Sequence, residues 1–402
     1  MMFVSIRARL IVNVDALNMA ESVGNYVKHR KVPVINPRTY TVHFVPAISG
    51  ESIAHRYQEI LVDEAKKRGL PVCKLCGKKR FLKSTNKQII SASFGNVPAF
   101  SSCHEVEKFI IENCVVEDIG GFLVAENLGK NIENVKRTSN FYTGYMIPVY
   151  EILEDSITEP QLHMRYALGL GELMKESQMI YYVEVASAIY RFSFDLDTQY
   201  IGKTAFEKVE ELADRQRRVE LACSALLQLL RELDFGAKRT RFLPVLKPES
   251  MMAAISPAAW TVPSAFTASY FEETLKKRER FGKEVKLLAY VDQLMLEDTS
   301  QYVQQTTKEL LAQFYKALEE FIELLKSKGD ADKLDIDKIK KEWLESFVKR
   351  RLDELANSRD LRYASCVARK YAEAKEKLEK SGVPVYTDYS EFLAALQEHI
   401  KE

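Results

Sequence analysis

Residues 179–196 constrain the fold most strongly, because they read MIYYVEVASAIYRFSFDL. This stretch is crowded with Tyr, Phe, Val and Ile and lacks Gly and Pro, so it predicts one long β-strand. Even-numbered positions from Tyr182 to Phe194 are mostly apolar, whereas odd-numbered positions from Val183 to Asp195 are mixed. Such alternation is typical of a sheet that packs one face on helices and leaves the other partly open. The open face is a candidate functional surface, but the binding motifs described below lie before and after this strand, so we expect the strand to support the site more than to line it.

The elements around this strand follow a known order. Residues 3–14 alternate as a first strand, residues 49–68 carry an apolar helical stripe, and residues 251–255 read as a last strand. A second helix is predicted over residues 204–233, with an apolar stripe made by Phe206, Val209, Leu212, Val219, Ala222, Leu226, Leu230 and Leu233. Further strands are expected between the first helix and residue 179. The resulting βαββαβ order is that of ferredoxin-like or RRM-like domains, so the predicted fold class is α+β.

Two long insertions and a change of character divide the chain further. The insertions span about residues 71–140 and 148–178, and connections of this length inside a compact domain are usually functional. After residue 292 the chain becomes charged, amphipathic and poor in strand-forming residues. We therefore expect an RRM-like palm over residues 1–292 and an α-helical C-terminal extension over residues 293–402.

Charge and composition limit the classes of function. The net charge is only +1 although 29% of the residues are charged, so nucleic acid would have to bind a local basic patch. Residues 1–14 lack the pattern of a secretory signal, and no apolar stretch reaches the ~20 residues of a membrane span. Six cysteines in a chain of this length are typical of a reduced protein rather than a disulfide scaffold. We expect a cytoplasmic protein with no membrane partner.

The strongest basic motif follows the second predicted helix. Gly236 precedes the cations Lys238, Arg239 and Arg241 and the apolar residues 242–244. The backbone N–H groups of a flexible turn and guanidinium side chains are well suited to clasping phosphates. The alternative is that Gly236 only ends the helix and that the cations complement its dipole.

Three further segments combine cations with polar or aromatic side chains. The first is Lys136, Arg137, Thr138, Ser139 and Asn140, followed by the aromatic Phe141, Tyr142 and Tyr145. This composition is common where single-stranded nucleic acid binds. The others are the polar loop with Asn18, Glu21, Ser22, Asn25, Lys28, His29 and Arg30, and the pair His163 and Arg165. No nucleophile and orienting group accompany His163, so the sequence does not favour catalysis by it.

A cysteine pair in the first insertion indicates a metal site. Residues 73–77 (CKLCG) have the form of a zinc knuckle, and the same insertion contains a second group of sulfur and imidazole donors. The predicted zinc ligands are Cys73, Cys76, Cys103 and His104, with Cys114 as a spare candidate. Adjacent ligands are geometrically awkward, and the alternative is a pair of reduced surface thiols. Structural zinc is the only cofactor that the sequence suggests.

Seven short motifs occur together and in order, and this ordered set is specific. They are Asn18-x-x-Glu21-Ser22-x-Gly24-Asn25-x-x-x-His29-Arg30, Pro46-x-Ile48-Ser49-Gly50-Glu51, Asp118-x-Gly120-Gly121-Phe122, Arg137-Thr138-Ser139, Gly144-Tyr145-Met146-Ile147-Pro148, His163-x-Arg165 and Gly236-x-Lys238-Arg239-x-Arg241-Phe242-Leu243-Pro244. Over about residues 1–292 the chain resembles the backbone subunit of archaeal type I-A CRISPR interference (Cascade) complexes, a DevR-like family of the RAMP superfamily.

The resemblance implies a palm with an inserted thumb, residues 148–178, and copies that stack into a helical filament along CRISPR RNA. It also implies that the guide pairs with invading DNA, that other Cascade subunits are partners, and that the chain is not an enzyme. The residues expected to line the RNA groove are Asn18, Ser22, Asn25, His29, Arg30, Ser49, Gly50, Lys136, Arg137, Thr138, Ser139, His163, Arg165, Lys238, Arg239 and Arg241. Phosphate contacts of this kind leave the base edges free to pair. The cysteine-bearing insertion occurs in only part of the family, and the tail after residue 292 departs from it.

Two other functions stay open at this point. Type III relatives cut target RNA with a loop carboxylate, and in this chain Asp15 or Glu21 would have to serve. The other alternative is a DNA-binding transcriptional regulator.

Overall fold

The computed structural model describes residues 2–83, 85–126, 134–167, 177–296 and 359–401, together with positions 128, 132, 312, 316, 319, 320 and 323. The chain divides into two compact units, residues 1–290 with 378–402 and residues 291–377. The second unit is described mainly at α7 (Gln293–Leu296) and along α11 (Arg359–Lys380), whose last residues belong to the first unit. Most of the predicted C-terminal extension therefore lies outside the described residues.

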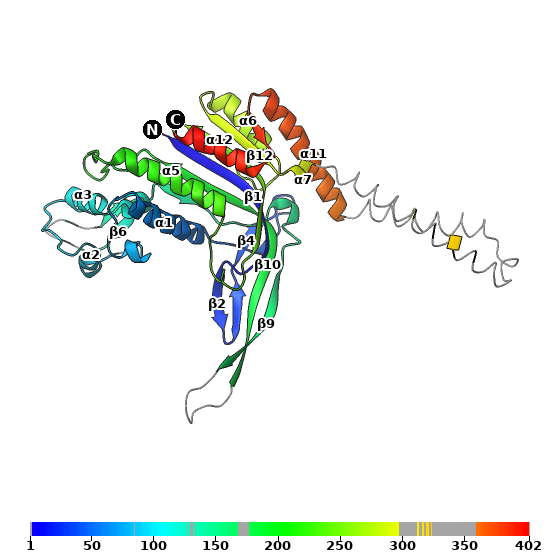
Figure 1. Ribbon diagram of the computed structural model, residues 1–402, viewed down its shortest axis with the longest axis horizontal. Coiled ribbons are helices and arrows are strands. Elements are labelled where there is room, and N and C mark those ends of the chain that lie inside the picture. Colours follow the sequence, from blue (N-terminus) through cyan, green and yellow to red (C-terminus); the bar gives the residue numbers. More distant parts are fainter. Residues whose placement is uncertain are drawn as a thin grey trace. The chain divides into compact units, whose positions relative to one another are not determined.

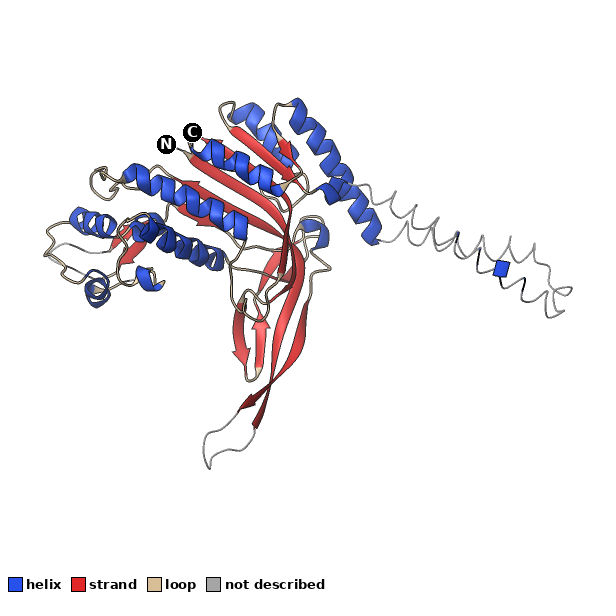
Figure 2. Cartoon of the chain, in the orientation of Figure 1, coloured by secondary structure: helices blue, strands red, loops and turns tan. Residues whose placement is uncertain are grey.

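The first unit is built on a mixed sheet with a centre of antiparallel strands (Figures 1 and 2). β1 (Phe3–Asp15) lies between β10 (Ser177–Asp197) and β11 (Val245–Ser256). The outer strands are β8 (Phe141–Thr143) beside β10, β12 (Lys286–Val291) beside β11, and β13 (Val385–Tyr386) beside β12. The central order is thus β11-β1-β10-β8, and each neighbouring pair is antiparallel. Sheet and helices together confirm the α+β class.

Alternation along the central strands separates the two faces of the sheet. The even-numbered side chains of β1 from Val4 to Val12 are buried, and so are those of β10 from Ala188 to Leu196. They share one continuous core with side chains of α1 (Gly50–Lys67), α5 (Arg215–Glu232) and α12 (Tyr389–Lys401), among others. The opposite face carries the odd-numbered side chains. The long strand predicted at residues 179–196, with its two unlike faces, is confirmed.

The two longest helices on the sheet differ in how well the sequence predicts them. α1 buries its whole predicted stripe, Ile53, Tyr57, Ile60, Leu61 and Ala65. α5 begins only at Arg215, whereas the prediction was residue 204. The Thr204 hydroxyl donates to Lys208 O at 2.7 Å and accepts from Glu210 N at 2.8 Å. Because a hydroxyl that bonds the local backbone favours a turn over a helix, Phe206 and Val209 are exposed instead of buried.

The first insertion folds into a small lobe with a core of its own. It contains η1 (Cys76–Lys78), α2 (Lys87–Phe94), α3 (Cys103–Asn113), α4 (Val115–Gly120), β6 (Phe122–Val124) and β7 (Val135–Arg137). Ile90, Val106, Ile110 and Val135 are among the residues of this core. Asn86 and Ser102 cap α2 and α3, since each side chain accepts a hydrogen bond from the first helical turn.

Three hairpins complete the first unit. β9 (Thr158–Ala167) runs antiparallel to the first half of β10, and the pair, here called the long hairpin, projects beyond the rest of the sheet (Figure 1). β2 (Met19–Val23) and β3 (Tyr26–His29) form a second hairpin, whose β3 runs parallel to β10. β4 (Lys31–Ile35) and β5 (Val42–Pro46) form the third. The long hairpin occupies the predicted thumb segment, of which residues 168–176 lie outside the described part.

The end of the chain packs with the first unit, which differs from the predicted domain division. β13 pairs with β12, and α12 places Phe392, Leu396 and Ile400 in the core of the sheet. These three residues recur at four-residue spacing, which puts them on one side of a helix. Residues 378–402 therefore belong with the sheet and not with a separate extension. None of the described helices is long and apolar enough to cross a membrane.

Candidate nucleic-acid interface

One end of the central sheet, here called the hairpin end, gathers most of the predicted binding segments. It comprises the long hairpin, the β2–β3 hairpin and residues 236–244, here called the basic loop. Asn25 Nδ2 donates to Ile180 O at 3.0 Å, which ties the β2–β3 turn to the long hairpin. Ala237 N donates to Leu17 O at 2.7 Å, which ties the basic loop to the segment before β2. Segments far apart in the sequence are thereby held side by side.

A buried ion pair anchors the β2–β3 hairpin to the sheet. His29 Nε2 lies 2.7 Å from one oxygen of Asp15, and the other oxygen accepts the Tyr190 hydroxyl at 3.0 Å. His29 Nδ1 faces the carbonyl oxygen of Arg30 at 3.0 Å, so both ring nitrogens meet acceptors, an arrangement that favours the protonated ring. Burial lowers the pKa of His29, but the hydrogen bond and the charge of Asp15 raise it above its ordinary value overall.

The burial of His29 corrects one predicted contact. Its side chain is 0% exposed, so it has no surface to offer to RNA. His29 is held in the interior by its backbone as well, because its N–H donates to the buried Glu184 at 2.8 Å. His29 therefore acts at the hairpin end by holding β3 in place.

Asn18 organises the residues next to this ion pair. Its Oδ1 accepts from Arg30 Nε at 2.5 Å and from Ser49 N at 3.3 Å, and its Nδ2 donates to Ser52 Oγ at 3.1 Å. These bonds join the start of α1 to the β2–β3 hairpin. Asn18 and Arg30 are half-buried, and Ser49 is buried. The side chains of Asn18 and Arg30 thus retain accessible surface, whereas Ser49 contributes to the framework.

The other predicted residues of this region differ in their exposure and in their structural role. Ser22 and Asn25 are exposed near the turn of the β2–β3 hairpin. Gly50 opens α1, and a Cβ at Gly50 would lie 2.9 Å from Thr143 O. Only glycine allows this approach, so Gly50 sets the distance between α1 and β8.

The basic loop presents its cations unequally. Arg239 donates to Asp234 O at 2.8 Å, as expected for a cation that complements the end of α5. Arg241 is exposed, and its side chain has no partner among the described residues. Gly236 has a φ of 89°, and a Cβ there would lie 2.7 Å from Leu17 Cβ. Arg239 therefore takes the predicted capping role, whereas a phosphate contact by Arg241 stays a prediction.

His163 connects the long hairpin to the basic loop. Its ring stacks on Tyr181 at 5.3 Å and meets the Phe242 ring edge-on at 5.1 Å. Its Nε2 is buried and has no partner within the described part of the chain. Arg165 follows on the same strand, in register with Met179. Two of the predicted motifs are thereby in contact.

The predicted segment 136–139 lies at the opposite end of the sheet, here called the far end. Asp197 N, at the end of β10, donates to Asn140 O at 2.8 Å. The hairpin end begins near Ala186, where β1 ends its pairing with β10. At about 3.3 Å per residue the two ends are roughly 35 Å apart along the strand. Lys136 and Thr138 are exposed there, and Ser139 is half-buried.

Arg137 is buried at the far end, which corrects a second predicted RNA contact. Its Nη1 donates to Glu107 at 2.8 Å, its Nη2 bonds Asp118, and its Nε donates to Asp118 O at 2.9 Å. The Arg137 side chain is 3% exposed. Asp118 also accepts from Arg218 at 3.0 Å, so two guanidinium groups share one buried carboxylate. Arg137 is thus a structural cation that joins the insertion lobe to α5.

A cavity of about 400 Å³ opens beside this segment. It is lined by Glu107, Lys136, Arg137, Thr138, Ser139, Asn140, Tyr142, Asp197, Tyr200, Ala205 and Phe206. Three of these are partly exposed aromatic residues, Tyr142, Tyr200 and Phe206. The sequence does not predict Tyr200, and it assigns Phe206 to a buried helical stripe. Phe206 is missing from the predicted site because the helix was predicted to begin too early, at residue 204.

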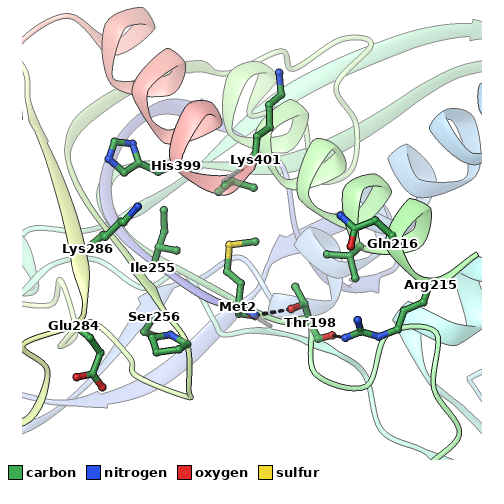
Figure 3. A pocket seen from close by; sticks show the side chains of 13 residues that line it. Met2, Thr198, Arg215, Gln216, Ile255, Ser256, Glu284, Lys286, His399 and Lys401 are labelled. Atoms are coloured by element: carbon green, nitrogen blue, oxygen red, sulfur yellow. Dashed lines mark hydrogen bonds between the residues drawn. The ribbon is translucent and has the colours of Figure 1, made fainter. Parts of the chain in front are cut away.

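A second cavity, of about 370 Å³, lies among α5, α12 and the ends of β11 and β12. Figure 3 shows Met2, whose backbone N donates to Thr198 Oγ1 at 2.9 Å, together with the cations Arg215, Lys286 and Lys401. None of the predicted binding residues lines this cavity. Its lining comes from both ends of the chain, so no local pattern in the sequence indicates it.

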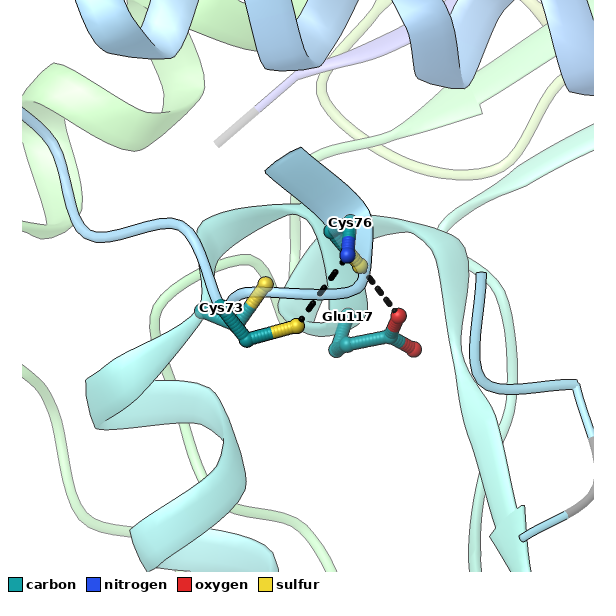
Figure 4. A group of neighbouring side chains, drawn as sticks. Cys73, Cys76 and Glu117 are labelled. Carbon is teal, nitrogen blue, oxygen red and sulfur yellow. Dashed lines mark hydrogen bonds between the residues drawn. The ribbon is translucent and has the colours of Figure 1, made fainter. Parts of the chain in front are cut away.

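Cys73, Cys76, Cys114 and Glu117 form one buried group, with donor atoms that all lie within 4.8 Å of one another (Figure 4). Cys76 N donates to Cys73 Sγ at 3.4 Å, and Cys76 Sγ donates to Glu117 Oε1 at 2.7 Å. The predicted pair Cys73 and Cys76 is therefore present in a cluster that could bind a metal.

The other two predicted ligands do not belong to this group. Cys103 and His104 begin α3, whereas Cys114 follows the end of that helix and precedes α4. Glu117 comes three residues after Cys114, in the first turn of α4, and this spacing places both side chains together. The Cys-x-x-Glu spacing of Cys114 and Glu117 is visible in the sequence. It could have indicated these two residues as the remaining ligands in place of Cys103 and His104.

Burial governs the ionisation of this group. Burial raises the pKa of Glu117 to about 7 and also raises that of Cys114. Hydrogen bonds with Cys114 and Cys76 lower the pKa of Cys73. Three thiols and a carboxyl are thus held in a site that protons or a cation must neutralise.

Comparison with known proteins gives one family. Residues 6–275, more than half of the chain, match the family model described as CRISPR-associated negative auto-regulator DevR/Csa2. A CRISPR-associated aCascade subunit Cas7/Csa2 2 of Saccharolobus solfataricus is 38% identical over 287 residues, which cover 68% of this chain and 85% of that protein. A CRISPR-associated protein Cas7/Csa2 1 of the same organism is 36% identical over 269 residues, or 65% and 81% of the two chains.

A structural likeness is more distant. A chain of a solved CRISPR RNA-guided surveillance complex covers 72% of this chain and 88% of its own length, with a TM-score of 0.40 and 10% identity. A chain of such a complex in a pre-nicking state gives a TM-score of 0.39 and 11% identity, with coverage of 72% and 91%.

Proposed function

Because the chain belongs to the CRISPR-associated DevR/Csa2 family, we propose that it is an RNA-binding backbone subunit of a CRISPR RNA-guided interference complex. In this proposal the chain acts in the cytoplasm together with other Cascade subunits. Several copies of it assemble along one guide RNA, and the guide RNA pairs with invading DNA. The strand order β11-β1-β10-β8 supports a ferredoxin-like palm, and the projecting long hairpin supports the role of thumb.

The observation that carries the proposal is the convergence of three segments at the hairpin end. His163 of the long hairpin contacts Phe242 of the basic loop, and Asn25 of the β2–β3 turn bonds the long hairpin. Arg241 is exposed on this surface, and Arg30 is half-buried. Neighbouring cations, amides and backbone N–H groups can bind phosphates, and the phosphate backbone is the same in every RNA sequence. Such contacts support a grip on the guide that does not depend on its sequence.

The same end of the sheet argues against RNA cleavage by Asp15. Its two carboxylate oxygens bond His29 and Tyr190, and its side chain is 0% exposed. A carboxylate that activates water or holds a catalytic metal must reach the substrate. Glu21 is exposed but pairs with Lys28 at 3.0 Å. We therefore propose a subunit that holds RNA without cutting it.

Salt-dependent RNA binding tests the proposal. The affinity for two unrelated single-stranded RNAs of equal length would be measured at several salt concentrations. Replacing Lys238 and Arg241 by Ala should weaken both complexes about tenfold and lower the salt slope by about 1.4, since each lost phosphate contact removes about 0.7. The matched control replaces Lys276 and Arg280, two exposed cations of α6 (Tyr270–Phe281), and should leave the slope unchanged.

Three outcomes would contradict the proposal. An unchanged slope in the Lys238 and Arg241 variant would mean that the basic loop only caps α5. Tighter binding to one duplex DNA site than to any RNA would favour the regulator alternative. Magnesium-dependent cuts in a complementary RNA, lost in Glu21→Gln, would favour the cleaving alternative.

We also propose that the cysteine cluster holds a structural zinc ion. Cys73, Cys76, Cys114 and Glu117 supply three sulfurs and one oxygen, a donor set and number that zinc accepts in closed structural sites. All four residues are buried. The group links the 73–77 turn to α4, so a metal there would fix the base of the insertion lobe.

Metal analysis of the purified chain tests this assignment. The wild-type protein should carry about one zinc per chain, and Cys114→Ser should lose it together with thermal stability. Cys103→Ser is the matched control, because it removes a predicted ligand that lies outside the cluster, and it should keep the metal. Zinc retained by Cys114→Ser but lost in Cys103→Ser would overturn the assignment.

A further inference from the structure

Arg191 occupies the middle of β10, on the face of the sheet opposite α1, α5 and α12. Its register partner on β1 is Arg9, and Arg7 stands opposite Ser193 on the same face. Three arginines therefore neighbour one another on the two central strands. Like charges directly opposite across a pair of strands destabilise a sheet, so each needs a counter-charge.

Two of these arginines have their counter-charges within the chain. Arg9 is buried and bonds Glu151 and, at 3.4 Å, Glu249. Arg7 bonds both oxygens of Asp195, at 2.7 and 2.9 Å. The carboxylates of Glu151, Asp195 and Glu249 are thereby engaged with Arg7 and Arg9.

Arg191 is the unmatched member of the group. It is half-buried, and within the described part of the chain its side chain has neither a hydrogen-bond nor an ion-pair partner. Burial, and then repulsion from Arg7, lower the pKa of Arg191, although a guanidinium stays charged. Sequestering a charge from water without a partner is costly, whereas the buried Arg137 and Arg218 both bond carboxylates. Among the described residues, no carboxylate offsets the charge of Arg191 in this way.

The surroundings of Arg191 indicate the kind of anion. Tyr142 stands opposite Asp195 in register, so it lies on the same face, and it is 48% exposed. Asp195 lies four positions after Arg191 along the strand, a distance of roughly 13 Å. Between them the Ser193 hydroxyl faces Gly144, where a Cβ would lie only 3.1 Å away. A cation, a hydroxyl and an exposed aromatic ring along one strand suit the phosphates and bases of a single-stranded nucleic acid.

We propose that Arg191 binds a phosphate of single-stranded RNA on the face of the sheet opposite α1, α5 and α12, with Tyr142 available to stack a base. This contact is separate from the hairpin end, because Arg191 lies on the central part of β10 that pairs with β1. The inference rests on the proposed RNA-binding function and adds a second place where the strand touches the protein.

Three variants of the full chain test this site. Arg191→Met keeps the apolar stem and removes the charge, Arg191→Lys restores a charge, and Arg280→Met removes an exposed cation from α6. The affinity for two unrelated single-stranded RNAs and the thermal midpoint without RNA would be measured for each. Arg191→Met should bind both RNAs threefold to tenfold more weakly and lower the salt slope by about 0.7. Its thermal midpoint should stay equal or rise, because an unmatched charge is removed, and Arg191→Lys should recover most of the affinity.

Each other outcome has a distinct meaning. An unchanged slope in Arg191→Met, together with a reduced slope when Lys238 and Arg241 are replaced, overturns only the site at Arg191. A lower thermal midpoint with an unchanged slope assigns Arg191 a purely structural role and also overturns it. Loss of self-association with unaltered RNA affinity would mean that a carboxylate of a second copy is the counter-ion. If the wild-type chain binds neither RNA, this inference and the proposed function both fail.

Discussion

The two ends of the central sheet carry similar residues but use them differently. At the hairpin end, Arg241 is exposed and Arg30 is half-buried, on segments that meet one another. At the far end, Arg137 is buried between Glu107 and Asp118, and only its neighbours Lys136 and Thr138 face solvent. A cation in a polar segment is therefore a candidate phosphate contact only where it forms no ion pair with a buried carboxylate.

The largest expected effect separates the two neighbours at the far end. Arg137→Met should lower the free energy of unfolding by about 3–5 kcal/mol, because Glu107 loses its buried counter-charge and Asp118 keeps only one of its two guanidinium partners, that of Arg218. Lys136→Met is the matched control and should change stability by less than about 0.5 kcal/mol. Urea denaturation measures both values. Equal stability of the two variants would show that the buried network does not support the fold.

The second prediction concerns the turn that places the basic loop. Gly236→Ala should lower the free energy of unfolding by roughly 1–3 kcal/mol and weaken RNA binding, because the new Cβ would collide with Leu17. Gly24 also has a positive φ, but a Cβ there meets nothing within 4 Å. Gly24→Ala should therefore cost about 1 kcal/mol or less. An RNA affinity equal in the two variants would mean that the position of the basic loop is unimportant.

The third prediction is a pH dependence at the hairpin end. The pKa of His29 is raised in the folded chain, so its pair with Asp15 stabilises the fold fully below the unfolded pKa of about 6.5. This stabilisation should be lost as the pH rises through the folded pKa, at about 1.4 kcal/mol for each unit by which the pKa is raised.

Thermal midpoints measured between about pH 6 and pH 9 test this dependence. His29→Gln should flatten the decline, whereas His55→Gln, at an exposed position on α1, should keep it. The same slope in His29→Gln and in the wild type would contradict the assigned pair.

The smallest expected effect concerns the contact between the long hairpin and the basic loop. His163→Ala removes the edge contact with Phe242 and the stack on Tyr181, and should cost about 0.5–1.5 kcal/mol. RNA affinity should fall less than when Lys238 and Arg241 are replaced. His163→Phe keeps an aromatic ring and should restore both values. If it restores stability but not affinity, the imidazole itself contacts RNA.

Much of the fold was predictable from local pattern. The alternation of residues 179–196 gave the central strand, and the stripe of α1 was buried as expected. The start of α5 was missed because the apolar positions Phe206 and Val209 fit the helical period, whereas Thr204 bonds the backbone of a turn. α12 was assigned to an extension because helical spacing shows which side is apolar but not what it packs against.

The candidate site was less predictable, because charge and position in the sequence do not report burial. His29 and Arg137 look like surface cations, yet each bonds carboxylates that lie elsewhere in the sequence. Cys114 and Glu117 replace the adjacent pair Cys103 and His104, since ligand geometry depends on where α3 ends. Arg191 received no role because its isolation becomes visible only when the partners of Arg7 and Arg9 are known.

Electron cryo-microscopy of the chain assembled with single-stranded RNA would locate the RNA on the protein. We expect a helical assembly in which RNA follows the hairpin end, in contact with Arg241 and the β2–β3 hairpin. RNA confined to the far-end cavity, or a discrete complex with duplex DNA and none with RNA, would contradict this expectation.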